Sequence, residues 1–243
     1  MGIIVFLYGL LCYSIGVAAL LYAILFTGNL WVPKSVDSPP ETGMPAALVI
    51  DLGLLALFAF QHSVMARPGF KKVWTRLVPT AMERSTYVLA SGLVLGLLCW
   101  QWQPIPGTVW NVANPIGRLL LQAGFWLGWV ILLSSTFMIN HFDLFGLRQV
   151  YLRLKSAPYT PVPFVEVAFY RFIRHPIMLG LLIGFWSTPD MSLGHLVLAG
   201  ASTGYILLGI FLEERDLKRE HGATYEQYRR NTSMLLPLPR KSS

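Results

Sequence analysis

The stretch RHPIMLGLLIGFWSTPDMSLGHLVLAGASTGYILLGIFLEERDLKREHG (residues 174–222) decides the fold. It contains two apolar runs, Ile177–Thr188 and Leu193–Leu212, separated by the PDMS of residues 189–192. Proline followed by aspartate marks a tight turn, so we expect an antiparallel pair of helices. At 1.5 Å per residue the first arm is about 20 Å long and the second about 30 Å. The outer ends of the two helices should therefore emerge on the same side of the bundle that they belong to.

Both outer ends of this pair are polar. Arg174 and His175 precede the first arm, and Glu213 and Glu214 follow the second. The arm lengths place the carboxylates about 10 Å further out than the histidine, on the neighbouring helix. Sequence positions some forty residues apart, by that geometry, form one polar site.

Two interpretations of these polar ends compete. In the simpler one, the arginine anchors a helix to lipid phosphates and the carboxylates belong to a solvated helical extension. However, paired carboxylates are out of place where a helix leaves the membrane among anionic lipid heads. Clustered cations opposite paired anions instead suit a zwitterionic ligand of nucleotide size, and the helix that begins at Pro176 would add its own attraction for an anion.

The whole chain has the composition of a membrane protein. It has 243 residues, of which 54% are hydrophobic and 13% charged, and its mean hydropathy is +0.54. Soluble domains carry about a quarter charged residues, and several runs approach the roughly 20 apolar residues that cross a bilayer. We predict an all-α, polytopic transmembrane helix bundle with five full helices plus a short C-terminal hairpin arm, about six crossings in all. The apolar runs are Ile3–Phe26, Ala46–Met65, Tyr87–Trp102, Ile116–Ile139, Ile177–Thr188 and Leu193–Leu212.

These runs are expected to form a single membrane domain over residues 1–243. Residues 1–140 hold the first four helices, and residues 141–243 hold a connector, the hairpin and a C-terminal segment. The first run should remain as a helix, because it lacks the basic start and the small-residue cleavage site of a signal peptide. The prolines of APYTPVP (residues 157–163) exclude one continuous helix from the connector.

The cysteines and histidines give no sign of a metal or disulfide site. Cys12 and Cys99 both lie in apolar runs, where cysteine behaves as a small hydrophobe. Two such residues make no disulfide framework, and no two histidines have the spacing of zinc ligands. We therefore expect no metal.

Basic residues mark alternate connections. Residues 66–85, residues 141–176 and the C-terminal tail are rich in lysine and arginine, whereas residues 29–45 and 103–115 are not. By the positive-inside rule, both termini and the C-terminal helix are cytoplasmic, in a bacterial-type inner membrane. The lipid bilayer is thus the expected partner, and this topology explains the net charge of +7 without nucleic acid. An aromatic belt at the outer ends would contain Trp31, Trp100, Trp102 and Trp110.

The segments RHPIMLG and EERDLKREHGATYEQY resemble the signature of the isoprenylcysteine carboxyl methyltransferase (NnrU-like) superfamily, membrane enzymes that use S-adenosylmethionine. The chain departs from the signature at Met178 and His221, where tyrosine and phenylalanine are usual. Leu208 also replaces an arginine that prenyl-protein enzymes carry, which puts a prenylcysteine substrate in doubt. The matching residues are Arg174, His175, Pro176, Gly180, Glu213, Glu214, Leu217, Gly222, Tyr225 and Tyr228.

Three upstream stretches are similar to one branch of this superfamily, whose members convert methanethiol to dimethyl sulfide. They are GNLWVPKSVDS (residues 28–38), FAFQHSVMARPGFK (residues 58–71) and NHFDLFGLRQVYL (residues 140–152). The resemblance implies a methyltransferase domain that acts on a small volatile thiol, with no obligate protein partner. It also implies a cofactor site in which Arg174, His175 and Pro176 hold one end of S-adenosylmethionine, Glu213 and Glu214 take its ammonium or ribose hydroxyls, and Tyr225 and Tyr228 close over it.

A thiol acceptor must lose its proton. A simple alkyl thiol is less acidic than a cysteine side chain, whose reference pKa is about 8.5, so a base or a cationic pocket would help. His141 and Asp143 are candidates for base and orienter, and Arg148 for stabilising the thiolate. In the alternative, Asn140 and His141 merely end a helix and Asp143 caps the next turn.

His62 is a further catalytic candidate, because a polar pair such as Gln61–His62 inside a membrane helix is suspected of function. Hydrogen bonding between helices explains the pair equally well. Two other functions also stay open at this stage. One is methylation of another membrane-dissolved thiol or of a lipid or prenylcysteine, and the other is a non-enzymatic membrane protein whose polar hairpin ends bind lipid or a partner.

Overall fold

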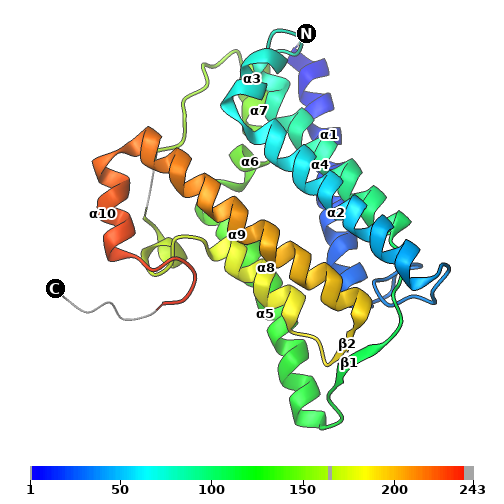
Figure 1. Ribbon diagram of the computed structural model, residues 1–243. Coiled ribbons are helices and arrows are strands. Elements are labelled where there is room, and N and C mark those ends of the chain that lie inside the picture. Colours follow the sequence, from blue (N-terminus) through cyan, green and yellow to red (C-terminus); the bar gives the residue numbers. More distant parts are fainter. Residues whose placement is uncertain (1, 164–165, 238–243) are drawn as a thin grey trace. The chain divides into compact units, whose positions relative to one another are not determined.

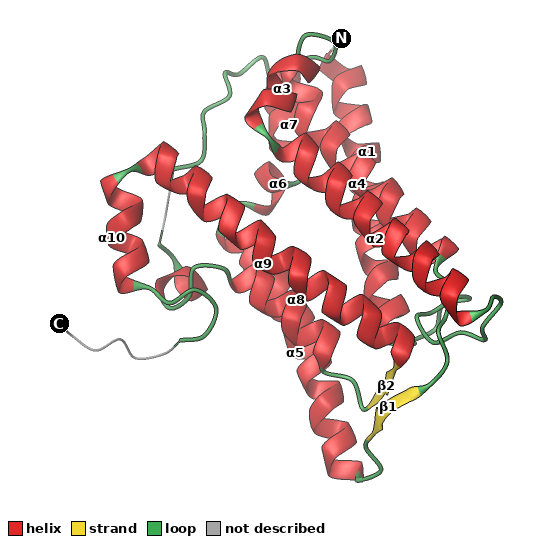
Figure 2. Cartoon of the chain, viewed as in Figure 1, coloured by secondary structure: helices red, strands yellow, loops and turns green. Residues whose placement is uncertain are grey.

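A computed structural model describes residues 2–163 and 166–237. The described chain is built almost entirely of helices, with two short strands (Figure 2). It divides into two compact units. The first comprises residues 2–109, 140–163 and 191–198, and the second comprises residues 110–139, 166–190 and 199–237. The prediction of an all-α, polytopic membrane bundle is confirmed.

The first unit is built around three long helices, α1 (Gly2–Thr27), α2 (Met44–Ala66) and α4 (Thr80–Gln101). α1 and α4 lie side by side (Figure 1). Their backbones approach closely where two glycines meet: a Cβ added to Gly92 would stand only 3.0 Å from the Cα of Gly16. A buried apolar cluster lies toward one end of these helices and consists of Phe26, Val36, Leu98, Cys99, Trp102 and Leu198.

Short helices complete the first unit, and the sequence patterns did not predict all of them. α3 (Pro68–Trp74) forms in the basic connection after α2, with proline at its first position, where a missing N–H costs nothing. α4 begins seven residues before the apolar run at Tyr87. These seven residues, TAMERST, are mostly polar, so hydropathy does not reveal them, and Glu83 stabilises the helix start at the positive end of its dipole. The connector contains α6 (His141–Leu144) and α7 (Leu147–Leu154) and then continues without a helix through the proline-rich 157–163, as predicted.

The second unit contains α5 (Pro115–Met138), the 3-10 helix η1 (Ala168–Arg171), α8 (Pro176–Trp186), α10 (Ala223–Asn231) and most of α9 (Leu193–His221). α5 packs against α8 (Figure 1) through glycines on both helices. A Cβ on Gly128 would stand 2.5 Å from the backbone N of Gly184, and one on Gly180 would stand 2.6 Å from the carbonyl O of Gly128. Small residues at this spacing let the helix backbones touch.

The connection between α8 and α9 differs from the predicted tight turn. Residues Asp190–Ser192 form strand β2, which pairs with β1 (Thr108–Asn111). Next to this pair, the Val112 amide donates to the Pro189 carbonyl over 2.9 Å, and Arg118 donates to both oxygens of Asp190. The guanidinium of Arg118 holds the pKa of Asp190 below its usual value.

The chain is an integral membrane protein. Among the described residues, four helices are long and apolar enough to cross a bilayer: α1, α2, α5 and α9. α8, at 11 residues, is too short to cross by itself, as expected for the hairpin arm. The number of crossings remains a prediction.

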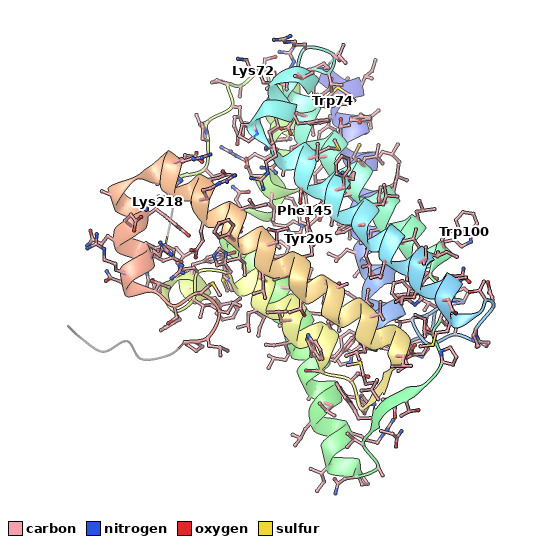
Figure 3. All side chains as sticks on the ribbon, in the orientation of Figure 1. Lys72, Trp74, Trp100, Phe145, Tyr205 and Lys218 are labelled. Carbon is pink, nitrogen blue, oxygen red and sulfur yellow. The ribbon has the colours of Figure 1, made fainter. Side chains whose placement is uncertain are left out.

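Tryptophans take two different positions in the first unit. Trp31 and Trp100 are 88% and 69% exposed, and Figure 3 shows the Trp100 ring at the end of α4, directed away from the helix. These positions suit an aromatic belt. Trp102, in contrast, is fully buried and packs edge-on against Phe26, so it belongs to the core and its place in the predicted belt is wrong.

Candidate functional site

The polar ends of α8 and α9 meet in the second unit. Arg174 and His175 directly precede the helix that starts at Pro176, and Glu213 and Glu214 lie near the end of α9. The Arg174 guanidinium lies 2.6 Å from the Glu214 carboxylate, and His175 Nε2 donates to the same oxygen over 3.1 Å. On the other side of the ring, His175 Nδ1 is 3.5 Å from Glu213. The prediction that the two ends form one polar cluster is confirmed.

The predicted offset of about 10 Å between His175 and the carboxylates is wrong. Trp186, the last residue of α8, donates from Nε1 to the hydroxyl of Thr203 over 2.9 Å. His175 lies eleven residues before Trp186, and Glu214 lies eleven residues after Thr203, and these two residues are again in contact. The helices are therefore antiparallel and level at their polar ends. The extra length of α9 falls at its beginning, because strand β2 separates the two helices where a tight turn was expected.

Helix α10 packs against this cluster. Tyr225 and Tyr228 are buried, and the Tyr228 hydroxyl donates to the carbonyl of Tyr170 over 2.6 Å. Burial raises the pKa of Tyr225 to about 12, so this phenol stays neutral at physiological pH. The two tyrosines that the signature supplies thus lie beside the charged residues, on a helix that the chain holds in place.

Three further residues belong to the cluster but were not found from the sequence. Arg229 Nε lies 3.2 Å from the second oxygen of Glu214, and Arg174 Nη1 donates to the carbonyls of Arg229 and Thr232. The Arg174 amide also donates to the carbonyl of Ser233 over 2.8 Å. Three of these contacts use backbone carbonyls, which no residue pattern reveals. The sequence signal that was available is the basic residue Arg229 directly after the signature residue Tyr228.

The candidate residues for the thiol acceptor lie in the first unit. His141 is buried, stacks on Phe145 with ring centres 4.5 Å apart, and shares a 2.9 Å hydrogen bond between its Nε2 and the Tyr13 hydroxyl. Burial lowers the pKa of His141 below its ordinary value of 6.5, so its neutral form, which can accept a proton, predominates near pH 7. Tyr13, in the middle of α1, was missed, although a tyrosine inside an apolar run is a recognisable signal.

Asp143 and Arg148 are bound to each other. Arg148 Nη1 donates to Asp143 over 2.8 Å and to the Thr160 carbonyl over 2.9 Å, while the Tyr159 hydroxyl donates to the second oxygen of Asp143 over 3.3 Å. Asn140 adopts a left-handed conformation, and its side chain caps α6 by accepting from the Asp143 amide. α5 ends at Met138 with Ile139 as its C-cap, so Asn140, and not Asp143 as the alternative had it, caps the next turn.

His62 has its own partners. Its Nε2 is 2.8 Å from the Tyr87 hydroxyl and its Nδ1 is 3.2 Å from the Ser91 hydroxyl, both on α4. Gln61 also donates to Ser91 over 3.3 Å. Both ring nitrogens thus take part in hydrogen bonds that join α2 to α4, which supports the interhelical interpretation of this pair. The described residues contain no group of histidine, cysteine and carboxylate side chains that could hold a metal ion.

Removing His141 should change how stability depends on pH. Because burial lowers the pKa of His141, the unfolded chain binds a proton at this position more readily than the folded protein does. Stability is therefore lost as the pH falls from about 6.5 toward the folded-state value and is regained as the pH rises. Melting curves in detergent between pH 5 and 8 should show a shallower decline at acid pH for His141→Gln than for the wild type. The same change at the part-exposed His221 provides the control, and identical curves for His141→Gln and the wild type would contradict the expectation.

Sequence comparisons find relatives of this chain among known proteins. A model of the family described as NnrU protein matches residues 51–219. Methanethiol S-methyltransferase from Crocosphaera subtropica is 53% identical over 98% of this chain and 94% of its own length, and the protein of the same name from Mycobacterium tuberculosis is 52% identical over 97% and 96%. Nurim from Homo sapiens is 32% identical over 71% of this chain and 69% of its own. No solved structure matches the chain.

Proposed function

The chain belongs to the NnrU protein family, and from this membership we propose that it transfers a methyl group from S-adenosylmethionine to methanethiol and so forms dimethyl sulfide. The observation that carries the proposal is the sequence identity of 53% and 52%, over nearly the full length of the chain, with two methanethiol S-methyltransferases. Such similarity makes the chain a methyltransferase and does not favour a non-enzymatic role. A prenylcysteine substrate is also disfavoured, since Leu208 offers no charge for its carboxyl group.

The residues at the polar ends of α8 and α9 fit the proposed methyl donor. S-adenosylmethionine supplies an electrophilic methyl group on a positively charged sulfur, and its amino-acid end carries both an ammonium and a carboxylate. Arg174, His175 and the helix start at Pro176 offer groups that attract an anion. The pair Glu213–Glu214 supplies negative charge on the side of the cluster that would face cations and hydroxyls, and the buried Tyr225 and Tyr228 exclude water. Alignment and exclusion of water are the main tasks that methyl transfer sets the protein.

For the thiol, we propose that His141 accepts the proton and that Tyr13 orients its ring. The hydrogen bond between them and the lowered pKa of His141 support this assignment. Arg148, fixed by Asp143, would stabilise the thiolate. His62 is kept as a weaker candidate, because both of its ring nitrogens are already hydrogen-bonded.

We also propose that residues 1–243 act as a single methyltransferase domain in an inner membrane of bacterial type, with both termini and α10 in the cytoplasm. The alternation of basic and non-basic connections supports this orientation. The lipid bilayer is the proposed environment, and no obligate protein partner is required.

Activity is tested with the purified protein in lipid nanodiscs, supplied with S-adenosylmethionine and methanethiol in sealed vials. Gas chromatography of the headspace should show dimethyl sulfide, with S-adenosylhomocysteine appearing in solution in equal amount. Vials without the methyl donor provide the control. Formation of S-adenosylhomocysteine with a longer thiol but not with methanethiol would reject the substrate, and absence of any product from folded protein would reject the activity.

A further inference from the structure

The two neighbouring carboxylates of the cluster are in different surroundings. Adjacent residues of a helix point about 100° apart, so Glu213 and Glu214 point in different directions and approach opposite nitrogens of the His175 ring. The Glu214 side chain is only 13% exposed, whereas that of Glu213 is 49% exposed.

Both oxygens of Glu214 are already occupied by cationic or polar donors. Its Oε1 accepts from Arg174 Nε over 2.7 Å and from His175 Nε2 over 3.1 Å, and its Oε2 lies 3.2 Å from Arg229 Nε. An ammonium group that approached this carboxylate would meet two guanidinium groups of like charge. Glu214 is therefore a poor site for the cation of a ligand.

Glu213 is engaged much less. Among the described residues, its ion-pair partner is His175 Nδ1 at 3.5 Å, which is longer than a hydrogen bond. A half-exposed carboxylate with one loose contact keeps most of its lone pairs available. It also lies beside the cluster rather than inside it, because His175 separates it from Glu214.

The contacts of Glu214 lead instead to α10. Arg229 lies on that helix, and Arg174, the other arginine bound to Glu214, donates to the carbonyls of Arg229 and Thr232 at the C-terminal end of α10. The backbone of residues 173–175 pairs with residues 233–234 next to it, through the bridge between Ile173 and Ser233. Glu214 and its two arginines thus tie α10 to the polar end of α8.

We propose that the two carboxylates have separate tasks, an inference that rests on the proposed cofactor. Glu213 is the carboxylate that meets the ammonium or hydroxyl groups of S-adenosylmethionine. Glu214 is a positioning residue that, together with Arg174 and Arg229, fixes α10 and its buried tyrosines against the site. Arg229 is accordingly a positioning residue as well.

The test compares Glu213→Gln, Glu214→Gln and Arg229→Met in the full-length protein in nanodiscs. Calorimetry with S-adenosylhomocysteine measures ligand affinity, and hydrogen exchange of the peptides that cover residues 223–234 in the ligand-free protein measures the docking of α10. Glu220→Gln is the matched control, since it makes the same change at an exposed position of α9.

For Glu213→Gln we expect the affinity for S-adenosylhomocysteine to fall about 10-fold or more, because one hydrogen bond to a charged group is lost, and we expect the exchange of α10 to be unchanged. For Glu214→Gln and Arg229→Met we expect exchange of α10 to rise several-fold or more.

The two halves of the proposal can fail separately from the proposed function. Wild-type affinity in Glu213→Gln, or faster exchange of α10 in that variant but not in Glu214→Gln, would overturn the separation of tasks. If the folded wild type does not bind S-adenosylhomocysteine at all, the proposed function and the role of Glu213 both fall. The exchange measurements would in that case still decide whether Glu214 and Arg229 hold α10.

Discussion

Replacing Arg174 by methionine should strongly reduce methyl transfer and release α10. The Arg174 side chain is 5% exposed and neutralises Glu214, and it also donates to two backbone carbonyls of the C-terminal segment. Removing one partner of a buried ion pair costs about 3–5 kcal/mol, because the other charge stays buried without compensation. We expect turnover to fall at least about 100-fold, which corresponds to an activation free energy about 2.7 kcal/mol higher. Trypsin should also cut at Arg229 and Arg230 much faster than in the wild type.

Two control variants separate the geometry of Arg174 from its charge. Arg174→Lys keeps the charge, but a lysine cannot donate in several fixed directions as a guanidinium does, so it should recover only part of the activity. Arg215→Met removes an arginine from an exposed position of the same region of α9 and should behave as the wild type. Turnover and tryptic stability of Arg174→Met close to those of the wild type would contradict the role given to this residue.

Replacing Gly180 by alanine should prevent α5 and α8 from packing. The added Cβ would stand 2.6 Å from the carbonyl O of Gly128 and 2.7 Å from the backbone N of Leu132. Both atoms belong to the backbone of α5, so no side chain can move aside and the helices must separate. Overpacking of this kind costs about 1–3 kcal/mol or more. We expect a clearly lower melting temperature in detergent and a lower yield of folded protein.

The matched control is Gly200→Ala on α9, where a Cβ would meet nothing within 4 Å. Alanine has the higher helix propensity by about 1 kcal/mol, so this variant should melt at the same temperature as the wild type or slightly higher. Equal melting temperatures for Gly180→Ala and Gly200→Ala would show that α5 and α8 do not depend on the glycine contact.

Much of the fold could be predicted because apolar runs determine membrane helices. The run Ile3–Phe26 became α1 (Gly2–Thr27), and Ile116–Ile139 became α5 (Pro115–Met138), with shifts of one residue at either end. The prediction failed where helices extend beyond their apolar part. The polar turn that starts α4 at Thr80 and the short basic helix α3 are stabilised by capping, dipole and packing effects rather than by hydropathy.

The sequence could predict which residues form the candidate site but not how they contact one another. The sequence predicts that Arg174 and Glu214 belong to one polar site, because a hairpin brings its two outer ends to the same side. Their close contact depends on where α9 begins, and strand β2 decides that. The carbonyls that bind Arg174 come from the backbone of the C-terminal segment. Such groups carry no sequence signal, so the anchoring of α10 became visible only in three dimensions.

The most direct test of the central claim is to locate the methyl donor on the chain. The wild-type protein in nanodiscs is irradiated with ultraviolet light in the presence of methyl-tritiated S-adenosylmethionine, digested, and its labelled peptides are identified by mass spectrometry. Label should appear in the peptides that contain residues 170–178 and 211–228, and an excess of S-adenosylhomocysteine should remove it. Competable label confined to α1, α2 or α4 would contradict the assignment of the cofactor to the polar ends of α8 and α9.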